Sequence, residues 1–90
     1  MLKPFYTSLF NKDVKKIAKQ HKDIDQLKEI VKKLIIQETL DSKYKDHKLK
    51  GQYEDYRECH LQPDWLLIYL IKADSITFVR TGSHSELFKK

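Results

Sequence analysis

The clearest indication of the fold is the segment YEDYRECHLQPDWLLIYLIKADSITFVR, residues 53–80. Its aromatic, β-branched and aliphatic residues gather in three segments that two short polar turns separate. The segments are Tyr53 to Leu61, Trp65 to Ile71 and Ser75 to Arg80, and the turns are Gln62-Pro63-Asp64 and Lys72-Ala73-Asp74. Apolar runs of this length between turn residues are typical of strands, and turns this short join neighbouring antiparallel strands. The stretch therefore predicts a three-stranded antiparallel meander.

The N-terminal part supplies a short strand and a first helix. Leu2 to Tyr6 is expected to be extended, at a sheet edge or a strand start, because Pro4 cannot donate a backbone hydrogen bond. Thr7 or Ser8 can then cap a helix. Its inward face is expected to consist of residues at helical spacing, namely Phe10, Val14, Ile17 and Ala18.

A second helix should follow at once. Asp23 with Gln26 resembles a capping box, and apolar residues at helical spacing continue to a predicted end near Leu40. Residues 41–52 are polar and lysine-rich, so we expect a long surface loop there, and Ser85 to Phe88 should form a short helical turn. The predicted fold class is α+β, a single domain over residues 1–90 in the order β-α-α-β-β-β, whose antiparallel sheet is covered on one face by the two-helix hairpin.

Composition limits the class of protein. The net charge is +5, 34% of the residues are charged and 40% are apolar, which describes a folded domain whose charge favours an anionic partner. Cys59 is the only cysteine, so no intramolecular disulfide can form. No apolar run approaches the length of a membrane span, and the N-terminus lacks the apolar region of a signal peptide. We therefore expect a cytoplasmic protein without a membrane partner.

Three of the four histidines are expected to meet at one end of the sheet. In a meander the first strand ends beside the start of the second, and the third ends at the same edge. That edge collects His60, Asp64, Trp65, Arg80 and His84. His47 reaches it if the preceding loop folds back, whereas His21, in the connection between the helices, stays apart. Imidazole titrates at a pKa of about 6.5, so the set suits acid–base chemistry on a charged substrate.

The remaining candidates concern phosphate, aromatic contacts and metal. A guanidinium can grip phosphate oxygens through two donors, and Arg80 sits at the histidine-bearing end, so it is the better phosphate ligand. Arg57 lies on the opposite face by alternation and is expected to pair with a carboxylate. Trp65 and Phe88 can stack on bases or simply pack. Histidines and an aspartate could instead form a zinc-binding site, but no tight ligand spacing such as HExxH is present.

Three motifs resemble the YafQ-type branch of the RelE/ParE toxin superfamily. They are YKDHKLKG at residues 44–51, YRECHLQPDWLLIY at residues 56–69 and RTGSHSELF at residues 80–88. The resemblance covers essentially the whole chain and implies the ribosome-dependent mRNA endonuclease of a bacterial type II toxin–antitoxin pair. It implies active-site positions at His47, His60, Asp64 and His84, with Trp65 and Phe88 near the site. The chain departs from the pattern at Glu58, where aspartate is common, and at Lys48, where proline often follows the first histidine.

The chemistry expected from these residues uses the nucleophile of the RNA itself. Cleavage by the 2'-hydroxyl needs a base, an acid for the leaving 5'-oxygen, and positive charge on the phosphate. We expect His47 as base and His84 as acid, with His60 and Arg80 stabilising the phosphate and Asp64 orienting an imidazole. The roles of His47, His60 and Asp64 can still be exchanged at this point.

The expected partners follow from the same interpretation. Lys45 and Lys50, beside His47, should contact the substrate together with Arg80, Trp65 and Phe88. The expected partners are a cognate antitoxin, mRNA on the ribosome and ribosomal RNA, and no cofactor or metal is expected. The alternatives are a non-catalytic toxin of the same fold, like the gyrase-poisoning ParE branch, or a basic RNA-binding module. Three titratable groups at one edge favour the enzyme.

Overall fold

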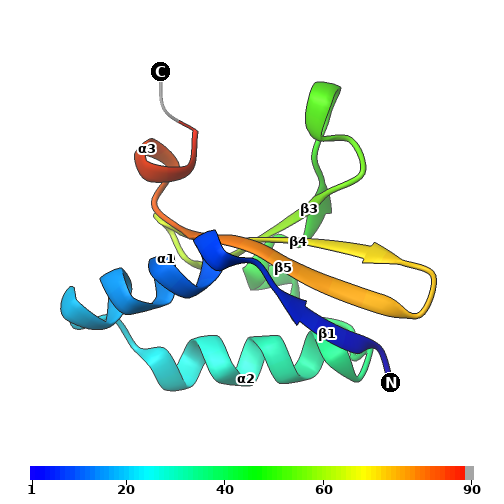
Figure 1. The fold of residues 1–90 in the computed structure, drawn as a ribbon, viewed down its shortest axis with the longest axis horizontal. Helices are drawn as coiled ribbons and strands as arrows, with labels where there is room; N and C mark the ends of the chain where they lie inside the picture. The colour runs from blue at the N-terminus through cyan, green and yellow to red at the C-terminus, as the bar shows by residue number, and fades with distance from the viewer. Residues whose placement is uncertain (89–90) are drawn as a thin grey trace.

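The computed structural model describes residues 1–88, except the side chain of Gln52, and shows one five-stranded sheet with helices on both sides (Figure 1). The elements in chain order are β1 (Lys3–Tyr6), α1 (Ser8–Lys19), α2 (Ile24–Ile35), η1 (Ser42–Tyr44), β2 (His47–Lys48), η2 (Gly51–Tyr53), β3 (Arg57–Gln62), β4 (Trp65–Lys72), β5 (Ser75–Gly82) and α3 (His84–Leu87). The predicted α+β class and the predicted order of the main elements are confirmed.

The sheet has the order β1-β5-β4-β3-β2 and is mixed rather than purely antiparallel. β3, β4 and β5 form the predicted antiparallel meander. β1 lies at one edge and pairs in parallel with β5, so Pro4 occupies an edge strand as expected. β2 lies at the other edge, antiparallel to β3, where the sequence predicted only loop. Its two residues are too few to show a strand period, and pairing with β3 creates the strand.

Both long helices begin as their capping residues predict. The Thr7 side chain accepts a hydrogen bond from the backbone N–H of Phe10, and the Asp23 side chain accepts one from Gln26. The Gln26 side chain donates to the Leu61 carbonyl instead of completing the capping box. The predicted end of α2 near Leu40 is wrong, because the helix ends at Ile35. The backbone then turns through Gln37, which has a φ of 62°.

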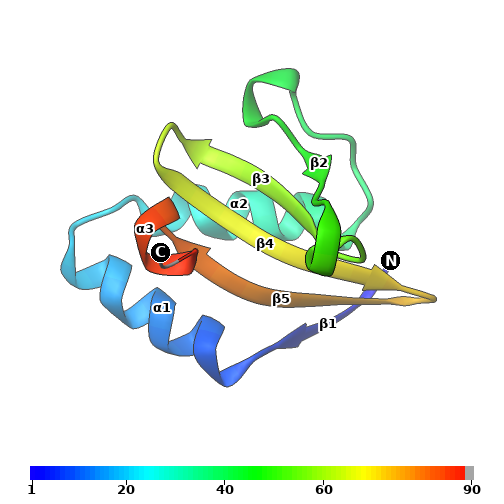
Figure 2. The same cartoon turned by 90° about the horizontal axis from the view of Figure 1, so that it is seen from above.

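The core lies between the sheet and the two long helices. Figure 1 shows α1 and α2 on one side of the sheet, with α3 and the segment before β3 on the other side. Figure 2 looks onto the sheet and shows α2 passing behind the strands, while α3 lies near the end of β5. The core residues come from α1, α2 and alternate strand positions, and include Phe10, Ile17, Leu27, Ile30, Leu34, Trp65, Leu67, Tyr69, Ile76 and Phe78. Leu66 and Ile68 are buried outside this cluster, at β4 positions that alternate with Leu67 and Tyr69 and therefore face away from the long helices.

Within residues 1–88, no helix has the length and apolar character needed to cross a membrane.

Candidate active site

The histidines of the three motifs converge on the sheet face away from the long helices. His47 lies on β2, His60 on β3, and His84 is the first residue of α3. The ring centroids of His47 and His60 are 6.2 Å apart, and those of His60 and His84 are 6.0 Å apart. The segment before β3 therefore folds back toward the other two histidines. This is the condition under which His47 was expected to join them. His21 stays apart, in the connection between α1 and α2.

Glu58 is the acidic residue at the centre of this row. It is only 4% exposed, and its Oε1 lies 3.1 Å from His60 Nε2 and 4.0 Å from His84 Nε2. From the sequence, Glu58 was noted only as a position where the family commonly has aspartate, and it was not predicted to lie in the site. The signal was present, because Glu58 and His60 are two residues apart on one strand and therefore share a face. The Glu58 carboxylate therefore lies within 4.0 Å of two imidazoles of the row.

Asp64, in the β3–β4 turn, contacts the start of α3. Its Oδ1 accepts a hydrogen bond from the backbone N–H of His84 at 3.2 Å and lies 3.8 Å from His84 Nδ1. The Asp64 side chain is 74% exposed and that of His84 is 56% exposed. The pair is thus open to a substrate, and the Asp64 carboxylate lies beside the His84 imidazole.

The short helix α3 is built to present His84 and Phe88. Ser83 caps it, and the Ser83 and Glu86 side chains each receive a hydrogen bond from the other's backbone N–H. The Phe88 ring lies 6.0 Å from the His84 ring, and it meets Tyr53 edge-on at 5.9 Å. Phe88 therefore borders the histidine row, as predicted.

Arg80 is not placed as a free phosphate ligand. Its Nε and Nη2 donate to the Asp13 carboxylate at 2.7 and 3.1 Å, and the same carboxylate accepts the Thr81 backbone N–H at 3.1 Å. The hydrogen bonds from Arg80 to Asp13 raise the pKa of Arg80 and outweigh its partial burial. The guanidinium tethers α1 to β5, so the predicted phosphate contact is corrected to a structural pair. Asp13, on a lysine-rich helix, carried no signal of this pairing.

Trp65 is likewise a core residue rather than a stacking surface. It is 0% exposed, and its indole N–H donates to the Thr81 hydroxyl at 2.9 Å. That hydroxyl donates in turn to the Leu66 carbonyl at 2.8 Å. A ring without an exposed face cannot stack on a base, so the predicted substrate contact of Trp65 is not supported, and the packing alternative holds.

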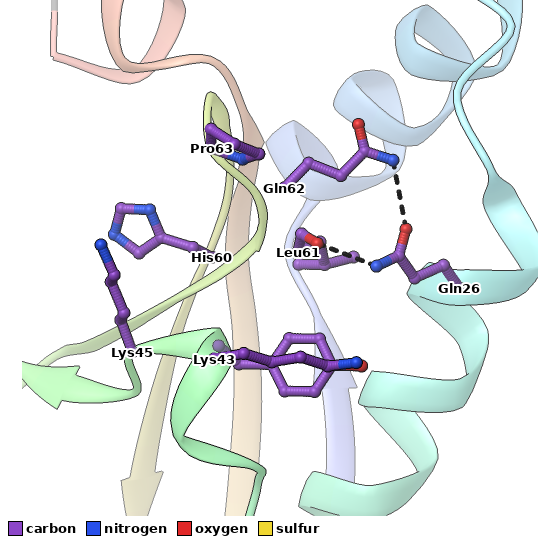
Figure 3. Close-up of a pocket in the computed structure, with 8 residues that line it drawn as sticks. Gln26, Lys43, Lys45, His60, Leu61, Gln62 and Pro63 are labelled. Carbon is purple, nitrogen blue, oxygen red and sulfur yellow. Dashed lines mark hydrogen bonds between the residues drawn. The ribbon is translucent and has the colours of Figure 1, made fainter.

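A pocket of about 360 Å³ opens beside His60. Figure 3 shows Lys45 and His60 on one side of it, with the lysine amine directed toward the imidazole, and Gln26 and Gln62 on the other side. Lys45 therefore brings positive charge to the site. Lys50 is exposed just before η2 and does not line this pocket.

One hydrogen bond decides which nitrogen of neutral His47 carries the proton. His47 Nδ1 lies 2.6 Å from the Lys45 carbonyl, which can only accept, so the proton is on Nδ1 and the lone pair of neutral His47 is on Nε2. His60 Nε2 lies 3.1 Å from the Glu58 carboxylate. Neutral His47 is thus able to accept a proton at Nε2.

Within the part of the chain that the structure describes, no three His, Cys, Asp or Glu side chains are grouped so that they could hold a metal ion. The three imidazoles lie in a row, with Glu58 between His60 and His84 and with Asp64 beside His84.

Comparison with known proteins identifies the family. Residues 2–89 match the family described as the bacterial toxin of type II toxin-antitoxin systems, YafQ. The chain is 44% identical to the mRNA interferase toxin YafQ of Escherichia coli strain K12 over 85 residues, which are 92% of this chain and 91% of that protein.

Solved structures agree with this match. The crystal structure of the E. coli DinJ–YafQ complex has a TM-score of 0.91 at 40% identity, with 98% of this chain and 99% of that chain covered. A metal-bound toxin from Helicobacter pylori also has a TM-score of 0.91, at 47% identity, with 98% and 100% covered. The resemblance seen in the three motifs is therefore confirmed: this chain belongs to the YafQ family of bacterial type II toxins.

Proposed function

We propose that the chain is an mRNA interferase, an endoribonuclease that cleaves mRNA on the ribosome by 2'-hydroxyl attack without a catalytic metal. The observation that carries the proposal is the row of three imidazoles at 6.2 and 6.0 Å beside a buried carboxylate. A toxin that acts by binding alone has no need of three titratable rings on one open face. The E. coli relative is named an mRNA interferase, which supports the same conclusion.

The row can divide the proton transfers between its two ends. His47 takes the proton of the 2'-hydroxyl at its free Nε2, since Nδ1–H is held by the Lys45 carbonyl. The 2'-oxygen then bonds to phosphorus, and the bond from phosphorus to the 5'-oxygen breaks. His84, exposed and beside Asp64, delivers the proton that this leaving oxygen needs. The products are a 2',3'-cyclic phosphate and a 5'-hydroxyl.

The centre of the row stabilises the negative charge that develops on the phosphate. The His60 imidazole, 3.1 Å from Glu58, and the Lys45 ammonium lie on the same side of the pocket, where they can contact the phosphate. Lys45 takes the role that the sequence suggested for Arg80, whose Nε and Nη2 donate to Asp13. Phe88, next to His84, offers a partly exposed ring against which a base can stack.

The chemical step is tested by the ends of the RNA products and by matched histidine variants. We expect 2',3'-cyclic phosphate or 3'-phosphate ends and 5'-hydroxyl ends, with cleavage retained in EDTA once ribosome integrity is controlled. His84→Asn should slow cleavage by about 10²- to 10⁴-fold, the usual contribution of an acid–base group. His21→Asn is the matched control, because asparagine tolerates the φ of 60° at that position. Ends carrying 5'-phosphate, or activity restored only by an added transition metal, would exclude this mechanism.

The proposed substrate is mRNA in the decoding site of the ribosome. The site is an open edge of a small domain, so it offers little surface to hold a flexible strand in line for attack, and such positioning lowers barriers by several kcal/mol. The lysines of α1 and α2 can contact ribosomal RNA phosphates, and these contacts should weaken as salt rises. Cleavage should therefore be fast on programmed ribosomes with an empty A site and feeble on naked RNA. Equal rates on both substrates would indicate a free ribonuclease.

A cognate antitoxin is the proposed inhibitor. The E. coli relative has been crystallised with DinJ. The net charge of +5 on this chain favours a partner with an acidic segment, because complementary charge speeds encounter. Co-expression of the product of the neighbouring gene should relieve growth arrest. Continued arrest despite equal expression of both proteins would count against this partner.

A further inference from the structure

A second polar cluster lies under the strand that carries His47, on the helix side of the sheet. The Tyr69 hydroxyl donates to Asp46 Oδ1 at 2.5 Å, and Arg57 Nε lies 3.3 Å from both that oxygen and the Tyr69 hydroxyl. Tyr69 is 1% exposed, and burial together with the hydrogen bond to Asp46 raises its pKa. The phenol therefore stays protonated and remains the donor. None of these three side chains belongs to the histidine row.

The segment that carries His47 is held on either side by Tyr44, which packs against the core, and by the Leu49 backbone N–H, which donates to the Tyr56 carbonyl. β2 consists of His47 and Lys48, which pair with Glu58 and Arg57 at the edge of the sheet. A two-residue edge strand holds its register weakly through backbone hydrogen bonds alone. Lys45, two residues before His47, has a φ of 49°, and a non-glycine residue persists in that region only where its surroundings hold it. The Lys45 backbone N–H donates to the Ser42 carbonyl, so the turn that ends η1 is held just before Asp46.

Asp46 is in the right place to be an anchor for His47. Its carboxylate is fastened to the helix side of the sheet, while the next residue, His47, presents its ring to His60 on the other side. Because successive side chains of an extended segment alternate, fixing the direction of Asp46 also fixes the direction of His47. The same segment contains the Lys45 carbonyl, which holds His47 Nδ1.

We propose that Asp46, Tyr69 and Arg57 form a positioning anchor that aims His47 at the substrate and keeps its Nε2 free to act as the base. The proposal rests on the catalytic role of His47 given under Proposed function. It assigns no contact with RNA to the three residues, which act through His47 alone.

The test removes one oxygen atom from the anchor. Tyr69→Phe deletes the donor to Asp46 and leaves the core ring in place, and Tyr6→Phe is the matched control on β1, outside the site. Single-turnover cleavage of mRNA on programmed ribosomes should slow about tenfold in Tyr69→Phe, since small misplacements of a catalytic group are costly. The half-saturating ribosome concentration should change less than about twofold, because binding groups are untouched. Tyr6→Phe should match wild type.

Two further measurements separate positioning from general damage. The double variant His47→Ala with Tyr69→Phe should cleave no more slowly than His47→Ala, because Tyr69 has no effect without the ring it positions. The imidazole NMR signals of His47 should shift or broaden in Tyr69→Phe and stay unchanged in Tyr6→Phe. Asp46→Asn keeps an acceptor for Tyr69 and should retain more activity than Asp46→Ala. Because Asp46 lies near the surface, this pair also serves if Tyr69→Phe does not fold.

The outcomes distinguish the anchor from the function on which it rests. Wild-type cleavage by His47→Ala would remove the role of His47 and overturn both proposals. If His47→Ala cleaves slowly while Tyr69→Phe and Asp46→Ala both cleave at the wild-type rate, the anchor alone is overturned. A double variant slowed by the product of the two single effects would show that Tyr69 acts independently of His47, and would also overturn the anchor.

Discussion

Replacing Asp13 by alanine removes three hydrogen bonds that tie α1 to β5. The carboxylate accepts from two nitrogens of Arg80 and from the Thr81 backbone, and the Asp13 and Arg80 side chains are 12% and 28% exposed. A hydrogen bond to a charged group contributes about 1.5–3 kcal/mol, and water can reach part of the Arg80 head, so the lower end applies to the pair. The orphaned Thr81 N–H adds about 1 kcal/mol. We expect the free energy of unfolding to fall by about 2–3 kcal/mol, which lowers the Tm of a domain this size by about 10–20 °C.

Urea unfolding at pH 7 measures this loss, and Asp13→Asn should lose less because its amide oxygen can still accept from Thr81. Arg80→Gln should also destabilise the protein, yet change the cleavage rate of the folded protein only a few fold. A loss below about 0.5 kcal/mol in Asp13→Ala, typical of an inert surface site, would refute the structural pairing. So would an Arg80→Gln protein of native stability that cleaves about a hundredfold more slowly, since that result would restore the guanidinium as a transition-state ligand.

Three other predictions concern single side chains. Thr81→Val deprives the buried Trp65 N–H of its acceptor and should cost about 2 kcal/mol in urea unfolding; wild-type stability would contradict the bond. Burial raises the pKa of Cys59 to about 12, so iodoacetamide at pH 8 should modify it only as the protein unfolds, and rapid alkylation of folded protein, followed by mass spectrometry, would refute this. The hydrogen bond from Lys16 lowers the pKa of Glu86 to about 2, below its ordinary 4.5, so any stability it contributes is present above pH 4.5 and is lost as the pH falls toward 2. The difference in unfolding free energy between Glu86→Gln and wild type should therefore shrink over that range, and a pH-independent difference would be inconsistent with the shift.

Local patterns were sufficient wherever the structure is decided by nearby residues. Thr7 and Asp23 cap the two helices as predicted, because a cap depends only on the next few residues. The meander formed as expected from its short turns. The second helix was predicted too long because Ile36 and Leu40 continue the apolar spacing, but the backbone turns at Gln37. Periodicity does not register such a turn when no glycine or proline marks it.

The sheet edges depended on contacts between distant residues. β1 pairs in parallel with β5, which is some 70 residues later, and nothing within Leu2 to Tyr6 specifies that partner or its direction. β2 exists only because His47 and Lys48 lie against β3, so the region looked like loop in the sequence. Strand pairing at edges is a property of the assembled sheet, and single-strand patterns do not report it.

The meeting of His60 and His84 could be predicted from the sequence, because the strand ends of an antiparallel meander bring them to one edge. The contacts of each neighbouring side chain at that edge depend on the packed fold. Glu58 lies in the site, and Trp65 is buried in the core. Arg80 pairs with Asp13, which lies on α1 and is distant in the sequence. Topology follows from local patterns repeated along the chain. A charged or aromatic side chain pairs with whichever group the fold brings within a few ångströms of it. The separation of two residues along the sequence does not predict the distance between their side chains in space.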